Sequence, residues 1–111
     1  MEKLLHYIWK HRILPLSELR TTDGRSVEVI DPGLLNMHAG PDFFNAKVRI
    51  DGVMWVGNVE IHERSADWFL HGHDTDAAYN NVVLHVAAVV DADVVTERGD
   101  HLPPVAVALP T

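Results

Sequence analysis

Three residues in the middle of the chain have the types and spacing of a metal-dependent phosphodiesterase centre: Asp42, Glu60 and His62. Glu60 and His62 are two positions apart, so on a strand both side chains project from one face, roughly 6 to 7 Å apart along the backbone. Two adjacent carboxylates repel unless a cation neutralises them, and Mg²⁺ or Mn²⁺ suits such ligands. The pattern predicts a divalent-cation site at Asp42 and Glu60, with His62 orienting a water or contacting phosphate as the third catalytic residue.

Two predicted strands position these residues. Residues 43–50 alternate between apolar and polar side chains, which is typical of a half-exposed strand, and residues 53–62 form the next strand. Asp51-Gly52 between them favours a tight hairpin turn. Because such a turn pairs the strands side by side, Asp42 is expected to fall almost opposite Glu60.

The remaining pattern predicts an α/β (α+β) fold with an αβββαβ core, a mixed central sheet flanked by helices and a trailing C-terminal hairpin. Trp9, Trp55 and Trp68 are expected to be core aromatics. The other predicted elements are a helix over 2–12, a hairpin over 19–30, a helix that begins after an N-cap at Ser65 and stops at Gly72, a buried valine-rich strand over 82–90, and a hairpin made of 93–97 and 105–109.

A second group of candidate ligands lies in the segment His71-Gly72-His73-Asp74-Thr75-Asp76. Its imidazoles and a carboxylate suit Zn²⁺ or another transition ion. The alternative is a loop in which Asp74 or Asp76 caps a helix and the histidines are solvated or hydrogen-bonded to the backbone. The alternative metal set consists of His62, His71, His73, Asp76 and His85.

His85 lies within the buried valine-rich strand, where a polar ring must find hydrogen-bond partners. It is interpreted either as a satisfied core histidine or as a residue that supports the site by pairing with Glu60 or Asp76. The structural alternative for the carboxylates is that Asp42 caps a turn and Glu60 forms an ion pair with Lys47 or Arg49 on the adjacent strand. Both alternatives stay open at the level of sequence.

Composition narrows the classes of function. At 111 residues the chain is expected to form one domain, over 1–111, and it has no cysteine, which excludes disulfides and thiolate zinc sites. No signal peptide and no membrane span is evident, so a cytoplasmic protein without membrane association is expected. The net charge of −7 does not support a nucleic-acid surface, so nucleic acid is a partner only by inference from the predicted centre.

The chain ends in a predicted strand, residues 105–109. This position predicts that the domain is an N-terminal fragment of a longer protein, with the rest of that protein as a partner. A homodimer formed through the same strand edge is consistent with an interaction domain.

The order of Pro41-Asp42 and then Glu60-Ile61-His62 on strands resembles the PD-(D/E)xK nuclease superfamily, with His62 where that superfamily has lysine. The resemblance implies a restriction-endonuclease-like core and metal-dependent phosphodiester hydrolysis. Histidine can still donate to phosphate or act as a base, but the permanent charge of lysine is lost.

Longer strings look like an uncharacterised bacterial family, domain of unknown function 2851, whose members are longer. This resemblance implies no activity. The alternatives to a nuclease are a catalytically inactive structural or interaction domain and a histidine-rich transition-metal hydrolase. The strings are Gly40-Pro41-Asp42-Phe43, Gly57-Asn58-Val59-Glu60-Ile61-His62, Asp67-Trp68, His71-Gly72-His73, Asp76, Tyr79 and Leu84-His85-Val86-Ala87.

Overall fold

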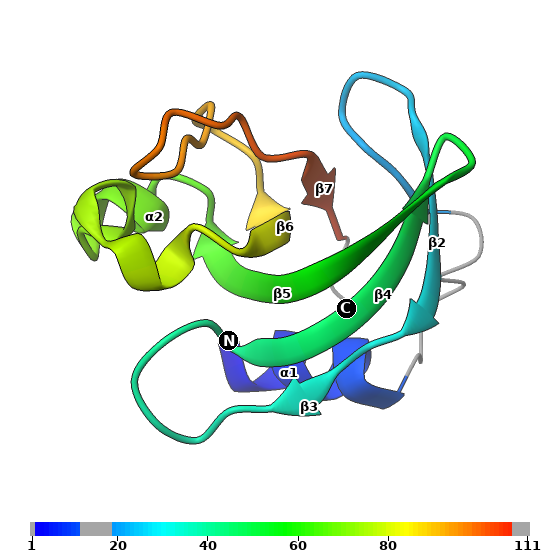
Figure 1. The fold of residues 1–111 in the computed structure, drawn as a ribbon, viewed down its shortest axis with the longest axis horizontal. Coiled ribbons are helices and arrows are strands. Elements are labelled where there is room, and N and C mark those ends of the chain that lie inside the picture. Colours follow the sequence, from blue (N-terminus) through cyan, green and yellow to red (C-terminus); the bar gives the residue numbers. More distant parts are fainter. Residues whose placement is uncertain (1, 12–18, 108–111) are drawn as a thin grey trace.

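The structure is a computed structural model that describes residues 2–11 and 19–107 (Figure 1). Its helices and strands follow the predicted order of helix, three main strands, helix and strand. The elements are α1 (Glu2–His11), β1 (Leu19–Arg20), β2 (Ser26–Asp31), β3 (Leu34–Leu35), β4 (Phe43–Ile50), β5 (Val53–Arg64), α2 (Asp67–Leu70), the 3₁₀ turns η2 (His73–Thr75) and η3 (Ala77–Tyr79), β6 (Val82–Val89) and β7 (Pro104–Ala106).

The strands form one mixed sheet in the order β1-β2-β4-β5-β6-β7, with β3 paired to β4. The strands from β1 to β5 pair antiparallel, whereas β5–β6 and β6–β7 are parallel. A parallel pair needs a crossover, and α2 with the two 3₁₀ turns provides it between β5 and β6. An antiparallel bridge between Thr21 and Val105 brings the two ends of the sheet together, so the sheet is strongly curled. The α+β class is confirmed.

One face of the sheet packs against α1. Leu5 and Trp9 of this helix are buried, at the spacing of one helical face, and they pack in a core with apolar residues of the sheet. The Trp9 indole N–H donates a 3.0 Å hydrogen bond to the Pro32 carbonyl. We call this core the α1 layer; the central strands contribute Val59, Ile61, Leu84 and Val86 to it.

The opposite face of β5 and β6 is covered by α2, the 3₁₀ turns and the segment after β6 (Figure 1). Trp68 of α2 is fully buried there, and its indole N–H donates to the Val95 carbonyl at 2.8 Å. We call this second core the α2 layer; its apolar members are Trp68, Tyr79, Val82, Val94 and Leu102.

The structure corrects the expected C-terminal hairpin, and it also corrects the expected roles of Ser65 and Trp55. The turn at residues 98–100 forms, but β7 pairs parallel with β6 and not with 93–97 in the described chain. The reason is that the His85 N–H finds an acceptor in the Pro103 carbonyl and Val105 is buried in the α1 layer. Predicted strand residues 108 and 109, like predicted helix residue 12, lie outside the described residues.

Ser65 is not the cap of α2. Its hydroxyl accepts hydrogen bonds from the Asp91 and Ala92 N–H groups, at 2.7 and 2.9 Å, and so joins the end of β5 to the segment after β6. Trp55 is not a core residue, since 51% of it is exposed near the tip of the β4–β5 hairpin. No helix of the described chain is long and apolar enough to cross a membrane.

Candidate metal centre

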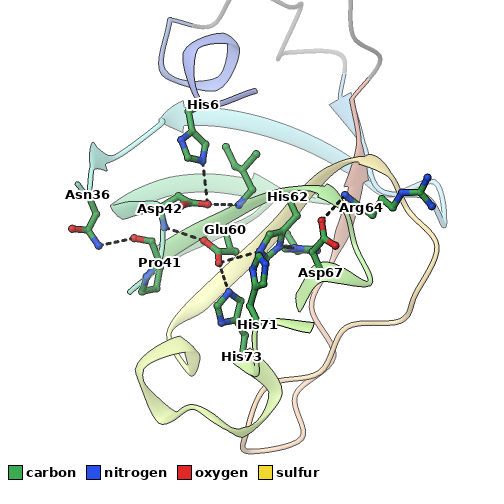
Figure 2. A network of polar contacts seen from close by, with 12 residues as sticks. His6, Asn36, Pro41, Asp42, Glu60, His62, Arg64, Asp67, His71 and His73 are labelled. Atoms are coloured by element: carbon green, nitrogen blue, oxygen red, sulfur yellow. Dashed lines mark hydrogen bonds and ion pairs between the residues drawn. The ribbon is translucent and has the colours of Figure 1, made fainter. Parts of the chain in front are cut away.

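The β4–β5 hairpin brings Asp42 and Glu60 together, as the turn and strand parity predict. Phe43 pairs with Val59, so Asp42 lies at the mouth of β4 beside Glu60. The Asp42 N–H donates to Glu60 Oε1 at 3.1 Å, and the Ile61 N–H donates to Asp42 Oδ2 at 2.8 Å. The same Asp42 oxygen lies 3.3 Å from Nε2 of His6, which reaches it from α1 (Figure 2).

His62 follows Glu60 on the same face of β5, and its ring links two further histidines. Its Nδ1 lies 2.8 Å from Nε2 of His85 on β6, and its Nε2 lies 3.2 Å from Nδ1 of His71. His62 is 2% exposed, so this ring forms the floor of the site. The contact with His71 opens toward the surface, where His71 is exposed.

His73 completes the group. Its Nε2 lies 2.8 Å from Glu60 Oε2, and that oxygen is 3.6 Å from Nε2 of His62 (Figure 2). Nitrogen atoms of His62, His71 and His73 all lie within 4.8 Å of one another. The three-histidine cluster, defined by these residues, can hold a metal ion.

The local chain path explains how His71 and His73 return to the strand. Helix α2 is only four residues long, and Gly72 after it has a φ of +73°, a left-handed conformation that suits glycine. Turn η2 begins immediately afterwards and points His73 back toward β5. Tyr79 of η3 stacks on the His73 ring, with centroids 3.8 Å apart, and the Trp68 ring edge packs against it at 5.2 Å. Aromatic packing therefore holds His73 in place.

The buried histidines are neutral near neutral pH. Burial lowers the pKa of His62 to about 3 and that of His85 to about 4, with neighbouring histidines adding to the effect. Burial, followed by the effect of His71, also lowers the pKa of His73. Because a metal ligand must be an unprotonated imidazole, these rings are in the protonation state that binding requires.

The two carboxyls differ in their titration. Burial, reinforced by Asp42, raises the pKa of Glu60 to about 10. Burial alone would raise the pKa of Asp42 too, but hydrogen bonds with His6, Glu60 and the Ile61 N–H hold it below its usual value. The Glu60–His73 contact has the distance of an ion pair. However, the raised pKa of Glu60 and the lowered pKa of His73 both favour the neutral forms of these side chains. We therefore interpret it, in the metal-free protein, as a hydrogen bond from the neutral Glu60 carboxyl to His73 Nε2.

The cluster opens into a polar cleft of about 380 Å³. Three further carboxylates, Glu2, Asp42 and Asp76, line it beside Glu60, and among the described lining residues there is no lysine or arginine. Asp76 reaches the cleft but also caps η3, since its carboxylate accepts from the Ala78 N–H at 2.9 Å. Asp76 therefore has the capping role that was the alternative to metal binding.

The structure also decides the partner of Arg49 and adds residues to the cleft. Arg49 pairs with Glu28 on β2 at 2.8 Å and does not approach Glu60, so the structural alternative of a Glu60–Arg49 pair is wrong. Two ionisable residues of the cleft to which the sequence pattern did not point are Glu2 and His38. The spacing of Glu2 and His6, four residues apart on one helical face, is a signal that points two ionisable groups toward the same neighbour.

One pair of donors in the three-histidine cluster has the spacing of two ligands on a tetrahedral metal ion. Two nitrogens bound at about 2.0 to 2.1 Å to such an ion lie about 3.3 Å apart, and the His62 Nε2 to His71 Nδ1 distance of 3.2 Å matches this. Imidazole nitrogen is the ligand that zinc, copper, iron and nickel accept, whereas Mg²⁺ prefers oxygen.

Comparison with known proteins identifies only a family. A family model described as a protein of unknown function (DUF2851) matches residues 2–109. No curated protein and no solved structure matches the chain.

Proposed function

Because the chain belongs to the DUF2851 family, whose description assigns no activity, we propose from the geometry that it is a transition-metal hydrolase domain of the zinc type. His62, His71 and His73 are the ligands, and Glu60 is the adjacent carboxylate. The observation that carries the proposal is the convergence of three imidazole nitrogens within 4.8 Å beside a buried glutamate, at the floor of an open cleft.

Each residue of the site has a role in this proposal. Three protein ligands leave a fourth position open, and a zinc ion held this way lowers the pKa of a bound water and polarises a carbonyl or phosphoryl group. Beside a divalent cation Glu60 is ionised, and its Oε2, 3.6 Å from His62 Nε2, is the acceptor for the water proton. Asp42 orients Glu60, because its backbone N–H donates to Glu60 Oε1.

The charge of the cleft favours a substrate without large negative charge. Glu2, Asp42 and Asp76 line the approach, and repulsion from these groups disfavours a polyanion such as nucleic acid. The chain as a whole carries a net charge of −7, which acts in the same direction. We therefore expect the zinc-loaded protein to hydrolyse p-nitrophenyl acetate, a neutral ester, faster than bis-p-nitrophenyl phosphate.

Metal binding is tested by calorimetry with Zn²⁺ and by elemental analysis of the purified protein. The parent is expected to bind one equivalent, and His71→Ala and His73→Ala are each expected to lose most of the affinity. His101→Ala is the matched control, because His101 is exposed and pairs with Asp93 outside the cleft. Unchanged zinc affinity in both ligand variants would contradict the proposal.

The role of Glu60 is tested separately from binding. Glu60→Gln keeps the size of the side chain and removes the base, so it is expected to retain zinc and lose ester hydrolysis. Circular dichroism checks that the variant is folded. If zinc-loaded E60Q hydrolyses the ester at the rate of the parent, Glu60 is not the base.

A second candidate function is the nuclease-type centre, in which Asp42 and Glu60 bind Mg²⁺ or Mn²⁺ and His62 is the third catalytic residue. The adjacency of Asp42 and Glu60 across the hairpin favours it. Calorimetry separates the two candidates. In the nuclease-type centre, Asp42→Asn abolishes Mn²⁺ binding and His71→Ala does not. In the zinc-type centre, His71→Ala weakens Zn²⁺ binding and Asp42→Asn does not. Absence of binding for both ions would support an inactive structural domain.

A further inference from the structure

We infer that His85 is a positioning residue for His62: it accepts a hydrogen bond from the His62 Nδ1–H and so leaves Nε2 of His62 free for the ion. The inference rests on the proposed zinc-type centre and concerns a residue outside the three-histidine cluster. His85 does not line the cleft, so its effect on a bound ion must pass through His62.

Among the described residues, the His85 side chain has a single polar partner, His62. Its side chain is fully buried, its Nε2 lies 2.8 Å from His62 Nδ1, and its Nδ1 has no hydrogen-bond partner among the described residues. The residue directly opposite His62 on β6 is Ala87, which has a small apolar side chain, and the His62 ring contacts His85. The edge of Trp68 packs against the His85 ring, with centroids 5.4 Å apart, and restrains it.

The direction of this hydrogen bond decides whether His62 can bind a metal. A neutral imidazole carries one ring proton. If His85 donates from Nε2, the His62 proton sits on Nε2, toward His71, and occupies the atom that the ion needs. If His62 donates from Nδ1, its Nε2 lone pair is free, and the proton of His85 moves to the buried Nδ1. One hydrogen bond between two buried rings thus selects the tautomer of a ligand.

The matched variants His85→Gln and His85→Met test the inference by zinc calorimetry. Gln places an amide oxygen near the position of Nε2 and can accept from His62, whereas Met fills a similar volume without a strong acceptor. Loss of a partner that orients a metal-bound histidine weakens binding by about 10- to 100-fold, so H85M is expected to lose this much while H85Q stays close to the parent. Parent-like affinity in folded H85M would overturn the inference.

A measurement on the parent protein keeps the test independent of whether H85M folds. Nitrogen-15 NMR of the zinc-loaded parent is expected to show His62 protonated at Nδ1 and zinc-bound at Nε2. Zinc bound at Nδ1 of His62 would overturn the role of His85 but leave the zinc centre standing. A parent in which zinc leaves His62, His71 and His73 unperturbed would overturn the proposed function and this inference together.

Discussion

The two faces of strands β5 and β6 are buried to a similar degree but are filled with different chemistry. In the α1 layer the strands contribute only apolar side chains, among them Val59, Ile61 and Leu84. In the α2 layer the alternate positions Glu60, His62 and His85 are buried just as deeply. One pair of strands thus carries a hydrophobic core on one side and a polar cluster on the other.

The contrast shows what each layer contributes. Burial of apolar surface stabilises the α1 layer, whereas buried polar groups oppose folding unless they are paired. The polar side is held by a chain of contacts from Asp42 through Glu60 to His73, and from His71 through His62 to His85. Stability comes mainly from the α1 layer, and chemistry is concentrated in the α2 layer.

The largest effect on stability is expected from a truncation in the α1 layer. Ile61→Ala leaves a cavity in a fully buried site and should lower the free energy of unfolding by about 2 to 5 kcal/mol. Val53→Ala on the same strand is the control, since Val53 is 54% exposed and should change stability by less than about 0.5 kcal/mol. Urea unfolding measures both. Similar losses in the two variants would contradict the layer comparison.

A smaller effect on stability is expected for the buried histidine pair, and the double variant should be more stable than either single variant. His62→Leu or His85→Leu alone leaves the other ring without its partner and should cost about 1 to 3 kcal/mol in the metal-free protein. The double variant removes both polar groups, so it should recover most of that loss while losing zinc binding. A double-mutant cycle in urea measures the coupling, and additive losses would show that the two rings do not depend on each other.

The pH dependence of the metal-free protein should have its optimum near neutral pH. Glu60 keeps its proton to about pH 10 when folded, against 4.5 as the reference value, so the native state binds more protons and stability falls as pH rises through this range. His62 and His85, with pKa values of about 3 and 4 against 6.5, act oppositely and lower stability as pH falls below 6.5. Between pH 4.5 and 6.5 the two histidines outweigh Glu60.

Thermal unfolding in EDTA, followed by circular dichroism across this pH range, checks the shape of the curve. Glu60→Gln should flatten much of the alkaline decline and leave the acid decline in place. Part of the remaining alkaline decline comes from His6, because its contact with the Asp42 carboxylate raises its pKa and that contribution is lost as pH rises through the raised value. An alkaline limb that is identical in E60Q and the parent would argue against a buried neutral Glu60.

The smallest effect is expected at Trp55, which belongs to neither layer. Trp55→Thr should change the free energy of unfolding by less than about 0.5 kcal/mol, because the side chain is 51% exposed on a strand. Trp68→Phe should cost at least about 1 kcal/mol, because it removes the hydrogen bond to the Val95 carbonyl and leaves space around a fully buried side chain. A larger loss for Trp55 than for Trp68 in urea unfolding would show that the hairpin tip is packed against something in solution.

Local pattern determined the hairpin and the pair of carboxyls. Strand alternation over 43–50, the Asp51-Gly52 turn and the two-residue spacing of Glu60 and His62 act over short distances along the chain, so sequence alone placed Asp42 beside Glu60. The order of helices and strands, and the family strings, followed from the sequence in the same way.

The tertiary structure decided which residues complete the site. His71 and His73 reach His62 only because the short helix α2, the left-handed Gly72 and the buried Trp68 fold that segment back over the sheet. His85 meets His62 through the register of a parallel pair of strands, which no local turn specifies. Such contacts join residues far apart in the chain and depend on packing between layers, whereas spacing in the sequence constrains only neighbours within a hairpin or a helical turn.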